Sequence, residues 1–303
     1  MERDVYDVII LGGGPAGLTA ALYCGRYGLK TLVIAKEIGG TTSLAPEIEN
    51  WPGLICTGKE LSKRFREHAE KFEAIIKEET ILSVFKKENL FEVETEKNKF
   101  YSKTIIICLG TQHKKLEIKG EEEFLGKGVS YCPTCDGNFF KNKTVGVIGG
   151  ANSAATAALY LSKIAKKVYI IYRRDKMRCE AILLNRLKEE QNVFFFYNSI
   201  PLEIIGDKKV KKLKILENNK EKYLDLDGVF IQIGAKPNLD VLKNLGLDVN
   251  EQDYIKTNKK METNLEGVFA CGDITDNPFK QITTAVGEGA VAASSVQEFI
   301  LRK

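Results

Sequence analysis

The stretch IILGGGPAG, residues 9–17 of a 303-residue chain, sets a glycine-rich turn directly after an apolar run. Residues 5–11 are mostly Val, Ile and Leu, a composition typical of a buried parallel strand. Gly12, Gly14 and Gly17 follow the GxGxxG spacing of dinucleotide-binding βαβ units. There the first glycine makes the tight turn, the second lets a pyrophosphate approach the backbone, and the third lets the helix pack on the sheet. We therefore expect an α/β fold with dinucleotide phosphates at the amino end of a helix.

The second strand of this unit is expected over residues 30–35, and it ends without the acid that usually binds a ribose hydroxyl. Ala35 holds that place, and Glu37 lies two residues further on. Glu37 is a candidate ribose ligand, although an ordinary surface glutamate explains it nearly as well. Residues 39–53 are too rich in Gly and Pro for regular structure, and long loops of this kind are usually functional.

The second half of the chain repeats this plan. A shift of 137 positions lays Gly12 on Gly149 and aligns the helix and strand that follow. Three short strands separated by polar turns are expected after each unit, over residues 81–107 and 203–233. The sequence therefore predicts two Rossmann-like dinucleotide-binding domains, each a parallel sheet with a three-stranded β-meander.

The second unit differs from the first where a dinucleotide would lie. Ala151 stands in the place of Gly14, and its methyl group would press on the approach of a pyrophosphate to the backbone. At the end of the second strand stand Arg173 and Arg174, with Arg178 one turn further on. Arginines there suit a 2′-phosphate through forked, charge-assisted hydrogen bonds, although a surface arginine cluster is the alternative explanation.

A pair of thiols, Cys132 and Cys135, precedes the second unit in a CxxC spacing that can close and reopen a disulfide. The other five of the seven cysteines are scattered in apolar or helical stretches, and we expect them to be buried small hydrophobes. The only histidines, His68 and His113, lie far apart, so we expect no structural zinc or other metal. One redox pair beside two nucleotide units suggests a flavoprotein that passes electrons from a carrier to a disulfide.

Near the C-terminus a buried strand ends in Gly272-Asp273. A carboxylate at the carboxyl end of a strand can bind a ribityl hydroxyl of a flavin. Lys280-Gln281-Ile282 then open a helix over residues 282–300, whose amino end could support negative charge on a reduced flavin ring.

Bulk properties exclude several classes of protein. The 45 Lys and Arg against 41 Asp and Glu give a net charge of only +4, which argues against nucleic acid. No apolar stretch is long enough to span a bilayer, and the charged start at residues 1–4 runs straight into a strand, which predicts no signal peptide. We expect a cytoplasmic protein without a membrane partner.

Together these stretches resemble the low-molecular-weight thioredoxin reductase family over essentially the whole chain. The matching pieces, in chain order, are residues 12–17, 47–53 (EIENWPG), 132–137 (CPTCDG) and 149–154, then Arg173-Arg174-Asp175 with Arg178, and Gly272-Asp273 with Lys280-Gln281-Ile282.

The resemblance implies an FAD domain built from residues 1–114 and 244–303, with an NADPH-binding and dithiol domain inserted over residues 115–243. It also implies a homodimer. The family rotates its inserted domain between two poses, which makes segments 111–118 and 238–247 hinge candidates.

The resemblance also implies a route for electrons from NADPH through FAD to the dithiol and on to thioredoxin. Cys135 would face the flavin, Cys132 would attack the disulfide of thioredoxin, and Asp136 would shuttle a proton. A role in capping a helix or turn explains Asp136 about equally well.

The cofactor ligands implied in this way lie in three parts of the chain. For FAD they are Gly12, Gly13, Gly14, Pro15, Ala16, Gly17, Glu37, Gly40, Thr41, Asn50, Gly272, Asp273, Lys280, Gln281 and Ile282. For NADPH they are Gly149, Gly150, Asn152, Ser153, Ala154, Arg173, Arg174 and Arg178.

Three departures from the family pattern stand out. Thr41 replaces the usual Gln, Tyr172 replaces the usual His, and Ala151 replaces the usual Gly. Ala151 leaves open a donor other than NADPH, such as reduced ferredoxin or a deazaflavin, although the three arginines favour NADPH. A flavin-bound redox sensor is a further alternative, but it would need only one nucleotide unit. A dihydrolipoamide-type reductase would carry its dithiol near residues 39–53, which contain no cysteine.

Overall fold

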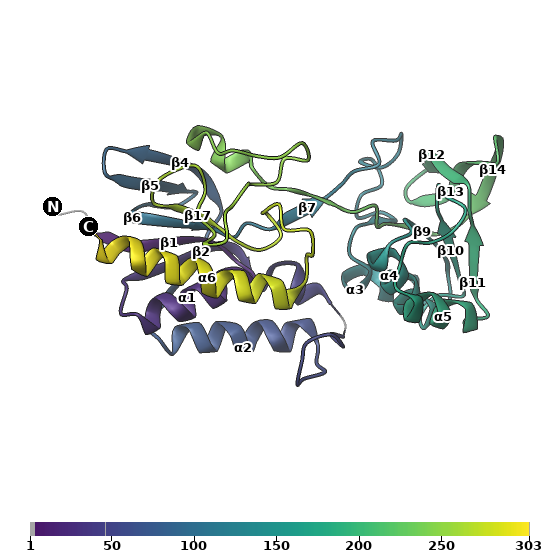
Figure 1. Cartoon of the computed structure of the whole chain (residues 1–303). Coiled ribbons are helices and arrows are strands. Elements are labelled where there is room, and N and C mark those ends of the chain that lie inside the picture. The colour runs from purple at the N-terminus through teal and green to yellow at the C-terminus, as the bar shows by residue number, and fades with distance from the viewer. Residues whose placement is uncertain (1–3, 46, 303) are drawn as a thin grey trace. The chain divides into compact units, whose positions relative to one another are not determined.

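The computed structural model describes residues 4–45 and 47–302, which form two compact units (Figure 1). Unit 1 is built from both ends of the chain, up to residue 112 and from residue 236 onward, and unit 2 comprises residues 113–235. The charged start at residues 1–3, and Pro46 in the loop expected over residues 39–53, lie outside the described residues.

Unit 1 contains these elements, in chain order: β1 (Val5–Gly13), α1 (Pro15–Arg26), β2 (Thr31–Ile38), η1 (Gly40–Leu44), α2 (Gly58–Glu70), β3 (Ile75–Glu78), β4 (Ile81–Lys87), β5 (Leu90–Thr95), β6 (Lys99–Ile107), β7 (Thr111–His113, which ends in unit 2), β16 (Ala235–Pro237, which begins there), η3 (Asp240–Leu245), β17 (Val268–Ala270) and α6 (Ile282–Leu301).

The sheet of unit 1 is a parallel one with an antiparallel branch. Its strands run in the order β3-β2-β1-β6, and β17 pairs in parallel with the last three residues of β6. The first residues of β6 pair with β5 instead, so one long strand serves both the parallel sheet and the meander of β4, β5 and β6.

Alternation along β1 decides what covers each face of this sheet. Val8 and Ile10 pack against α1 and α6, whereas Ile9 and Leu11 pack with the meander and η3. Figure 1 shows the two helices and the meander on opposite sides of β1. All four side chains are fully buried. Because β1, β6 and β17 run parallel, their carboxyl ends lie at one edge of the sheet.

Unit 2 repeats the architecture with these elements: β8 (Val129–Ser130), α3 (Pro133–Asp136), η2 (Gly137–Phe140), β9 (Thr144–Ile148), α4 (Asn152–Ser162), β10 (Lys167–Ile171), α5 (Ala181–Glu189), β11 (Val193–Phe196), β12 (Ser199–Gly206), β13 (Val210–Glu217), β14 (Lys220–Asp225) and β15 (Gly228–Ile231).

Its parallel sheet has the order β11-β10-β9-β15-β8, and its meander forms a separate three-stranded sheet of β12, β13 and β14. The predicted fold class, two Rossmann-like units that each carry a meander, is confirmed.

The boundaries differ in detail from those expected. The inserted unit ends at residue 235, because Leu242 and Leu245 of η3 are buried in the core of unit 1. The hinge candidate 238–247 therefore lies within unit 1, and the chain crosses between the units in β16. The other hinge candidate, 111–118, contains the crossing in β7, which pairs with β16.

The loop over residues 39–53 contains more regular structure than expected. Gly40–Leu44 form the short helix η1, and Ile48 makes an antiparallel bridge with Cys56.

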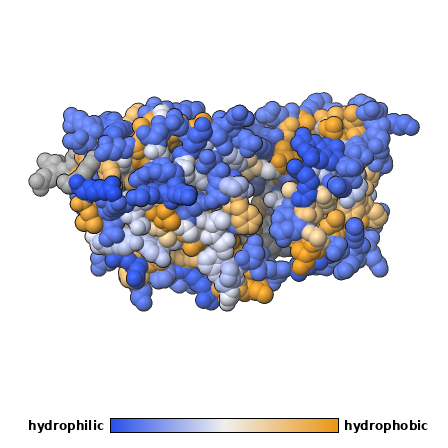
Figure 2. Space-filling view, viewed as in Figure 1, coloured by the Kyte–Doolittle hydropathy of each residue, from blue (hydrophilic) through white to orange (hydrophobic). Residues whose placement is uncertain are grey.

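Hydrophilic side chains cover most of the face seen in Figure 2. Within the described ranges, no helix combines the length and apolar character that a membrane crossing requires.

Candidate active site

The turn between β1 and α1 explains its glycines by close packing. Gly12 has φ +114°, and a Cβ there would lie 2.2 Å from the carbonyl oxygen of Cys108. A Cβ on Gly17 would lie 2.0 Å from the carbonyl oxygen of Gly12. Gly14 is different: it caps the amino end of α1, and a Cβ there would meet nothing within 4 Å. The open space thus lies in front of α1, where a phosphate would be stabilised.

Other residues predicted to hold FAD gather around this turn. The N–H of Gly39 donates to the carbonyl oxygen of Gly13 at 2.8 Å, and Gly40 packs beside Gly14. Thr41 is exposed on η1, and Glu37 is exposed near the end of β2. Pro15 and Ala16 form the first turn of α1.

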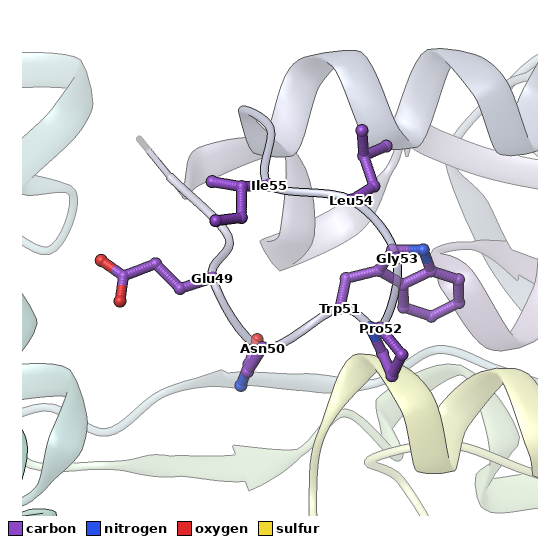
Figure 3. A pocket seen from close by; sticks show the side chains of 7 residues that line it. All are labelled: Glu49, Asn50, Trp51, Pro52, Gly53, Leu54 and Ile55. Carbon is purple, nitrogen blue, oxygen red and sulfur yellow. The ribbon is translucent and has the colours of Figure 1, made fainter.

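The amino end of α6 meets the loop that carries Asn50, whose Nδ2 donates to Oε1 of Gln281 at 2.9 Å. Gln281 is the N-cap of α6 and forms a capping box with Thr284. Figure 3 shows the turn over residues 49–55, which lines a pocket of its own. The structure therefore joins two predicted flavin ligands that lie 231 residues apart.

Three ionisable groups lie together at the carboxyl end of β17. Burial raises the pKa of Asp273, while the positive charge of Lys280 acts in the opposite direction. Burial lowers the pKa of Lys280, whose Nζ donates to the carbonyl oxygen of Thr275 at 2.7 Å and lies 3.9 Å from the ring centre of Tyr254. A half-buried cation held in this way can respond to charge on a bound ring.

Sequence reasoning missed the third group, Glu288, which is only 8% exposed. Its carboxylate accepts hydrogen bonds from the N–H of Gly272 at 2.6 Å and from the side chain of Asn277. Burial raises its pKa, which the hydrogen bond from Gly272 opposes. The signal available was an acid set between two glycines in an otherwise small and apolar helix. Glu288 fixes Gly272 and so the position of Asp273.

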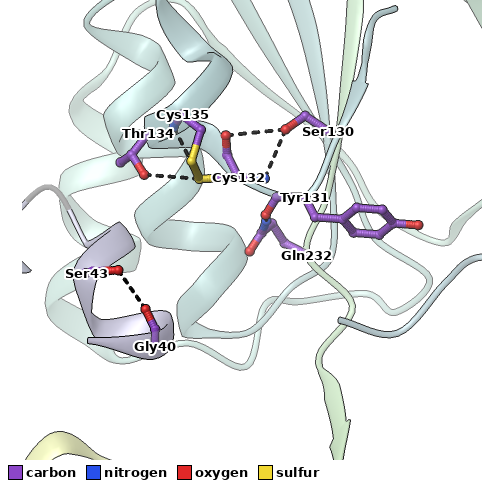
Figure 4. The surroundings of a disulfide bond; sticks show 8 residues. All are labelled: Gly40, Ser43, Ser130, Tyr131, Cys132, Thr134, Cys135 and Gln232. Atoms are coloured by element: carbon purple, nitrogen blue, oxygen red, sulfur yellow. Dashed lines mark hydrogen bonds between the residues drawn. A yellow bond between two sulfur atoms is a disulfide. The ribbon is translucent and has the colours of Figure 1, made fainter. Parts of the chain in front are cut away.

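Cys132 and Cys135 are joined as a disulfide at the start of α3 (Figure 4). The Sγ of Cys132 accepts from the N–H of Cys135 at 3.2 Å, and the N–H of Cys132 donates to Oγ of Ser130 at 2.9 Å. Asp136 caps η2 only through its backbone, because its side chain makes no capping hydrogen bond. A side-chain capping bond from Asp136 is thus not seen at η2, while its role as a proton shuttle stays a prediction.

The five remaining cysteines are free thiols. Cys24, Cys56, Cys108 and Cys271 are buried as expected, whereas Cys179 is partly exposed. Cys108 and Cys271 are also neighbours, with 3.3 Å between their sulfur atoms, because β6 and β17 are paired.

The segment just before the dithiol is tied firmly into unit 2. Tyr131 donates from its hydroxyl to Oε1 of the buried Glu121 at 2.5 Å, and its carbonyl oxygen accepts from Nε2 of Gln232 at 2.9 Å. Its ring also stacks on His113, with 5.5 Å between the centroids. These contacts fix the backbone that presents Cys132.

The glycine turn of unit 2 matches the first one at its start. Gly149 has φ +143°, and a Cβ there would lie 2.1 Å from the carbonyl oxygen of Gln232. Ala151 takes the N-cap position of α4 in extended backbone, and its methyl group is exposed. Asn152 bonds to Glu180 through both atoms of its amide, so it is held as part of the turn.

The other predicted NADPH ligands around this turn differ in how exposed they are. Ser153 is exposed and Ala154 is buried against the sheet. Arg173, Arg174 and Arg178 are all exposed beyond β10. Within the described residues no carboxylate forms an ion pair with these three guanidinium groups, so they are available to an anionic ligand.

Comparisons with known proteins agree with this geometry. Residues 6–289 match the family described as pyridine nucleotide-disulphide oxidoreductase. The thioredoxin reductase of Bacillus subtilis (strain 168) is 41% identical, over 99% of this chain and 96% of that protein. A crystal structure of Lactococcus lactis thioredoxin reductase superimposes with a TM-score of 0.95 at 39% identity, covering 98% of this chain and all of that one.

A structure titled as a ferredoxin-flavin thioredoxin reductase, from Clostridium acetobutylicum, is 34% identical with a TM-score of 0.55, and each chain is fully covered.

Proposed function

The chain belongs to the pyridine nucleotide-disulphide oxidoreductase family and, within it, to the low-molecular-weight thioredoxin reductases, and from this we propose that it reduces the disulfide of thioredoxin. We propose that the electrons come from NADPH and pass through FAD to Cys132 and Cys135. One observation carries the proposal: within the described residues, this CxxC is the pair of cysteines joined by a disulfide, and the other five are free thiols.

FAD is assigned to unit 1, because its features fit that cofactor. The open space before α1 suits a pyrophosphate, and Asp273 at the strand end suits a ribityl hydroxyl. FAD, when bound, supplies two-electron chemistry that connects a hydride donor to a disulfide. Lys280 and the amino end of α6 would stabilise negative charge on its reduced ring.

The thiol chemistry then falls to unit 2. In the reduced enzyme the Cys132 thiolate attacks the disulfide of thioredoxin, which forms a mixed disulfide and releases one thioredoxin sulfur as a thiolate. Cys135 next attacks the sulfur of Cys132, which restores the enzyme disulfide and frees the second thioredoxin thiolate. The two thiolates take up two protons, and we assign the transfer of one of them to the carboxyl group of Asp136.

NADPH is assigned to unit 2, where Arg173, Arg174 and Arg178 would hold its 2′-phosphate. The second candidate is the same reductase supplied by reduced ferredoxin or a deazaflavin. Two observations favour it: the exposed methyl group of Ala151 at the amino end of α4, and the similarity to the ferredoxin-flavin thioredoxin reductase of Clostridium acetobutylicum. Membership of this family also supports a cytoplasmic location and a homodimer. Light scattering would test the homodimer.

The experiment that tests the proposed function uses the Cys132→Ser variant of the FAD-loaded enzyme. We expect NADPH to reduce the flavin still, while thioredoxin-linked turnover falls below detection, because the attacking thiol is missing. Cys179→Ser, which changes a free and partly exposed thiol, is the control and should keep full turnover. Undiminished turnover in Cys132→Ser would refute the assigned role of the pair.

A further inference from the structure

We propose that Tyr172 is a positioning residue that holds the guanidinium group of Arg178 for the 2′-phosphate, so that the two residues together distinguish NADP(H) from NAD(H). The proposal rests on the assignment of NADPH to unit 2. It concerns Tyr172, the position at which this chain departs from the His usual in its family.

The ring of Tyr172 lies on the glycine turn. Tyr172 follows directly after β10 and is only 6% exposed. A Cβ built on Gly150 would lie 2.5 Å from three atoms of this ring. Gly150 does not have the positive φ of Gly149, so the ring, and not the backbone conformation, requires a glycine here. Tyr172 is thereby fixed to the glycine turn, at which the dinucleotide is proposed to bind.

Arg178 is tied to the same place by two hydrogen bonds. Its backbone N–H donates to the carbonyl oxygen of Gly150 at 2.6 Å, and its Nε donates to the hydroxyl of Tyr172 at 3.0 Å. A guanidinium has five N–H donors in a planar fork. Because Nε is occupied by Tyr172, the two terminal nitrogens remain for a ligand, and the side chain is exposed.

This arrangement separates two roles among the arginines. Arg173 and Arg174 are exposed and have no such hydrogen bond from the guanidinium within the described residues, so they supply positive charge without a fixed direction. Arg178 supplies a directed fork, because its rotamer is already held before a ligand arrives. A preorganised side chain loses less freedom on binding, and bidentate recognition of a phosphate needs that fixed geometry.

The pairing of Tyr172 with Arg178 should raise the affinity for only one of the two nucleotides. NADP(H) carries the 2′-phosphate that the fork would meet, whereas NAD(H) has a hydroxyl there. Loss of the Tyr172 hydroxyl should therefore weaken NADP⁺ and leave NAD⁺ unchanged. A residue that only supported the turn would affect both nucleotides alike, since both place a pyrophosphate at α4.

The test is calorimetric titration of the FAD-loaded enzyme with NADP⁺ and with NAD⁺. For Tyr172→Phe, which keeps the ring and removes the hydroxyl, we expect about fivefold weaker binding of NADP⁺, the scale of one typical net hydrogen bond. Binding of NAD⁺ should change by less than about twofold. The control is Tyr223→Phe, an exposed tyrosine on β14 in the same unit, which should change neither.

A double-mutant cycle makes the pairing explicit. Arg178→Lys keeps the charge but removes the fork and the Nε donor, so we expect weaker NADP⁺ binding and no further loss when Tyr172→Phe is added. Full additivity of the two changes, or equal losses for NADP⁺ and NAD⁺, would overturn the pairing while NADPH stands as donor. Failure of the unaltered enzyme to bind NADP⁺ would overturn the donor assignment and the pairing with it.

Discussion

The two glycine turns of this chain both have glycine at their first two positions and differ at the third, where Gly14 corresponds to Ala151. A Cβ on Gly12 or on Gly149 would approach a carbonyl oxygen of the neighbouring strand to 2.2 or 2.1 Å, so the fold itself demands both glycines. Gly13 packs beneath Ile38 and Ala35, whereas Gly150 packs beneath the ring of Tyr172. The first position is therefore set by the βαβ geometry, and the second by the side chains that pack over it in each unit.

The charges beside the turns differ in the same way. Asp273, Lys280 and Glu288 of unit 1 are buried or half-buried, and burial shifts the pKa of each. Arg173 and Arg174 of unit 2 are exposed. A resident cofactor suits the enclosed set, and a substrate that must arrive and leave suits the exposed one.

The largest effects are expected when the first glycine of the turn is replaced in each unit. Gly12→Ala and Gly149→Ala should each lower the free energy of unfolding by about 3 kcal/mol, since both combine a positive φ with a clash against backbone. Urea denaturation would measure this. Gly12→Ala should be isolated with less than stoichiometric flavin, and Gly149→Ala with its full complement.

Gly53→Ala gives the matched control, because Gly53 has φ +88° but open space around its Cβ position. It should cost clearly less than either turn variant. Equal costs for all three would show that backbone strain alone, without the clash, explains the turns.

An exchange at the third position should have a smaller effect and should act on ligands. Gly14→Ala adds a methyl group to open space, so stability should hold while FAD binds about tenfold more weakly, a loss of about 1.4 kcal/mol. Ala151→Gly removes the corresponding methyl group, and we expect NADPH to bind about threefold more tightly. Flavin fluorescence and NADPH titration would measure the two affinities.

If Gly14→Ala left the FAD affinity unchanged, the open space before α1 would not be the pyrophosphate site. If Ala151→Gly weakened NADPH binding, the methyl group would be part of the nucleotide contact and not an obstacle to it.

The smallest effect is expected from the pH dependence of Glu288. Because burial holds its folded-state pKa above the ordinary value of 4.5, the folded protein retains this proton more tightly than the unfolded chain does. The free energy of unfolding should therefore fall as pH rises from about 4.5 through the folded pKa. Glu288→Gln should lack this contribution.

The measurement is urea denaturation of both proteins between about pH 4 and 7. Asp273 and Lys280 remain in both proteins, so the difference between the two curves isolates Glu288. Parallel curves would show that the proton on Glu288 is held equally in the folded and unfolded states.

Local patterns in the sequence predicted the strand–turn–helix units and their repeat, because those depend on residues close together in the chain. Contacts between distant segments were not predictable in this way. Tyr254 lies beneath Lys280 because the neighbouring Ile255 bridges to Thr275, and Cys108 lies beside Cys271 because β6 pairs with β17. The boundary at residue 235 was not predicted because it depends on the packing of Leu242 and Leu245 in the core of unit 1. No local sequence pattern indicates that packing.

Anaerobic titration with absorbance detection is the decisive measurement of whether electrons from NADPH reach Cys132 and Cys135 through a flavin. We expect two equivalents of NADPH per flavin, one for the disulfide and one for the flavin, to bleach the flavin absorbance of the purified enzyme, and oxidised thioredoxin added afterwards to restore it. A flavin that stays oxidised in excess NADPH, yet is bleached by dithionite, would refute this route for the electrons.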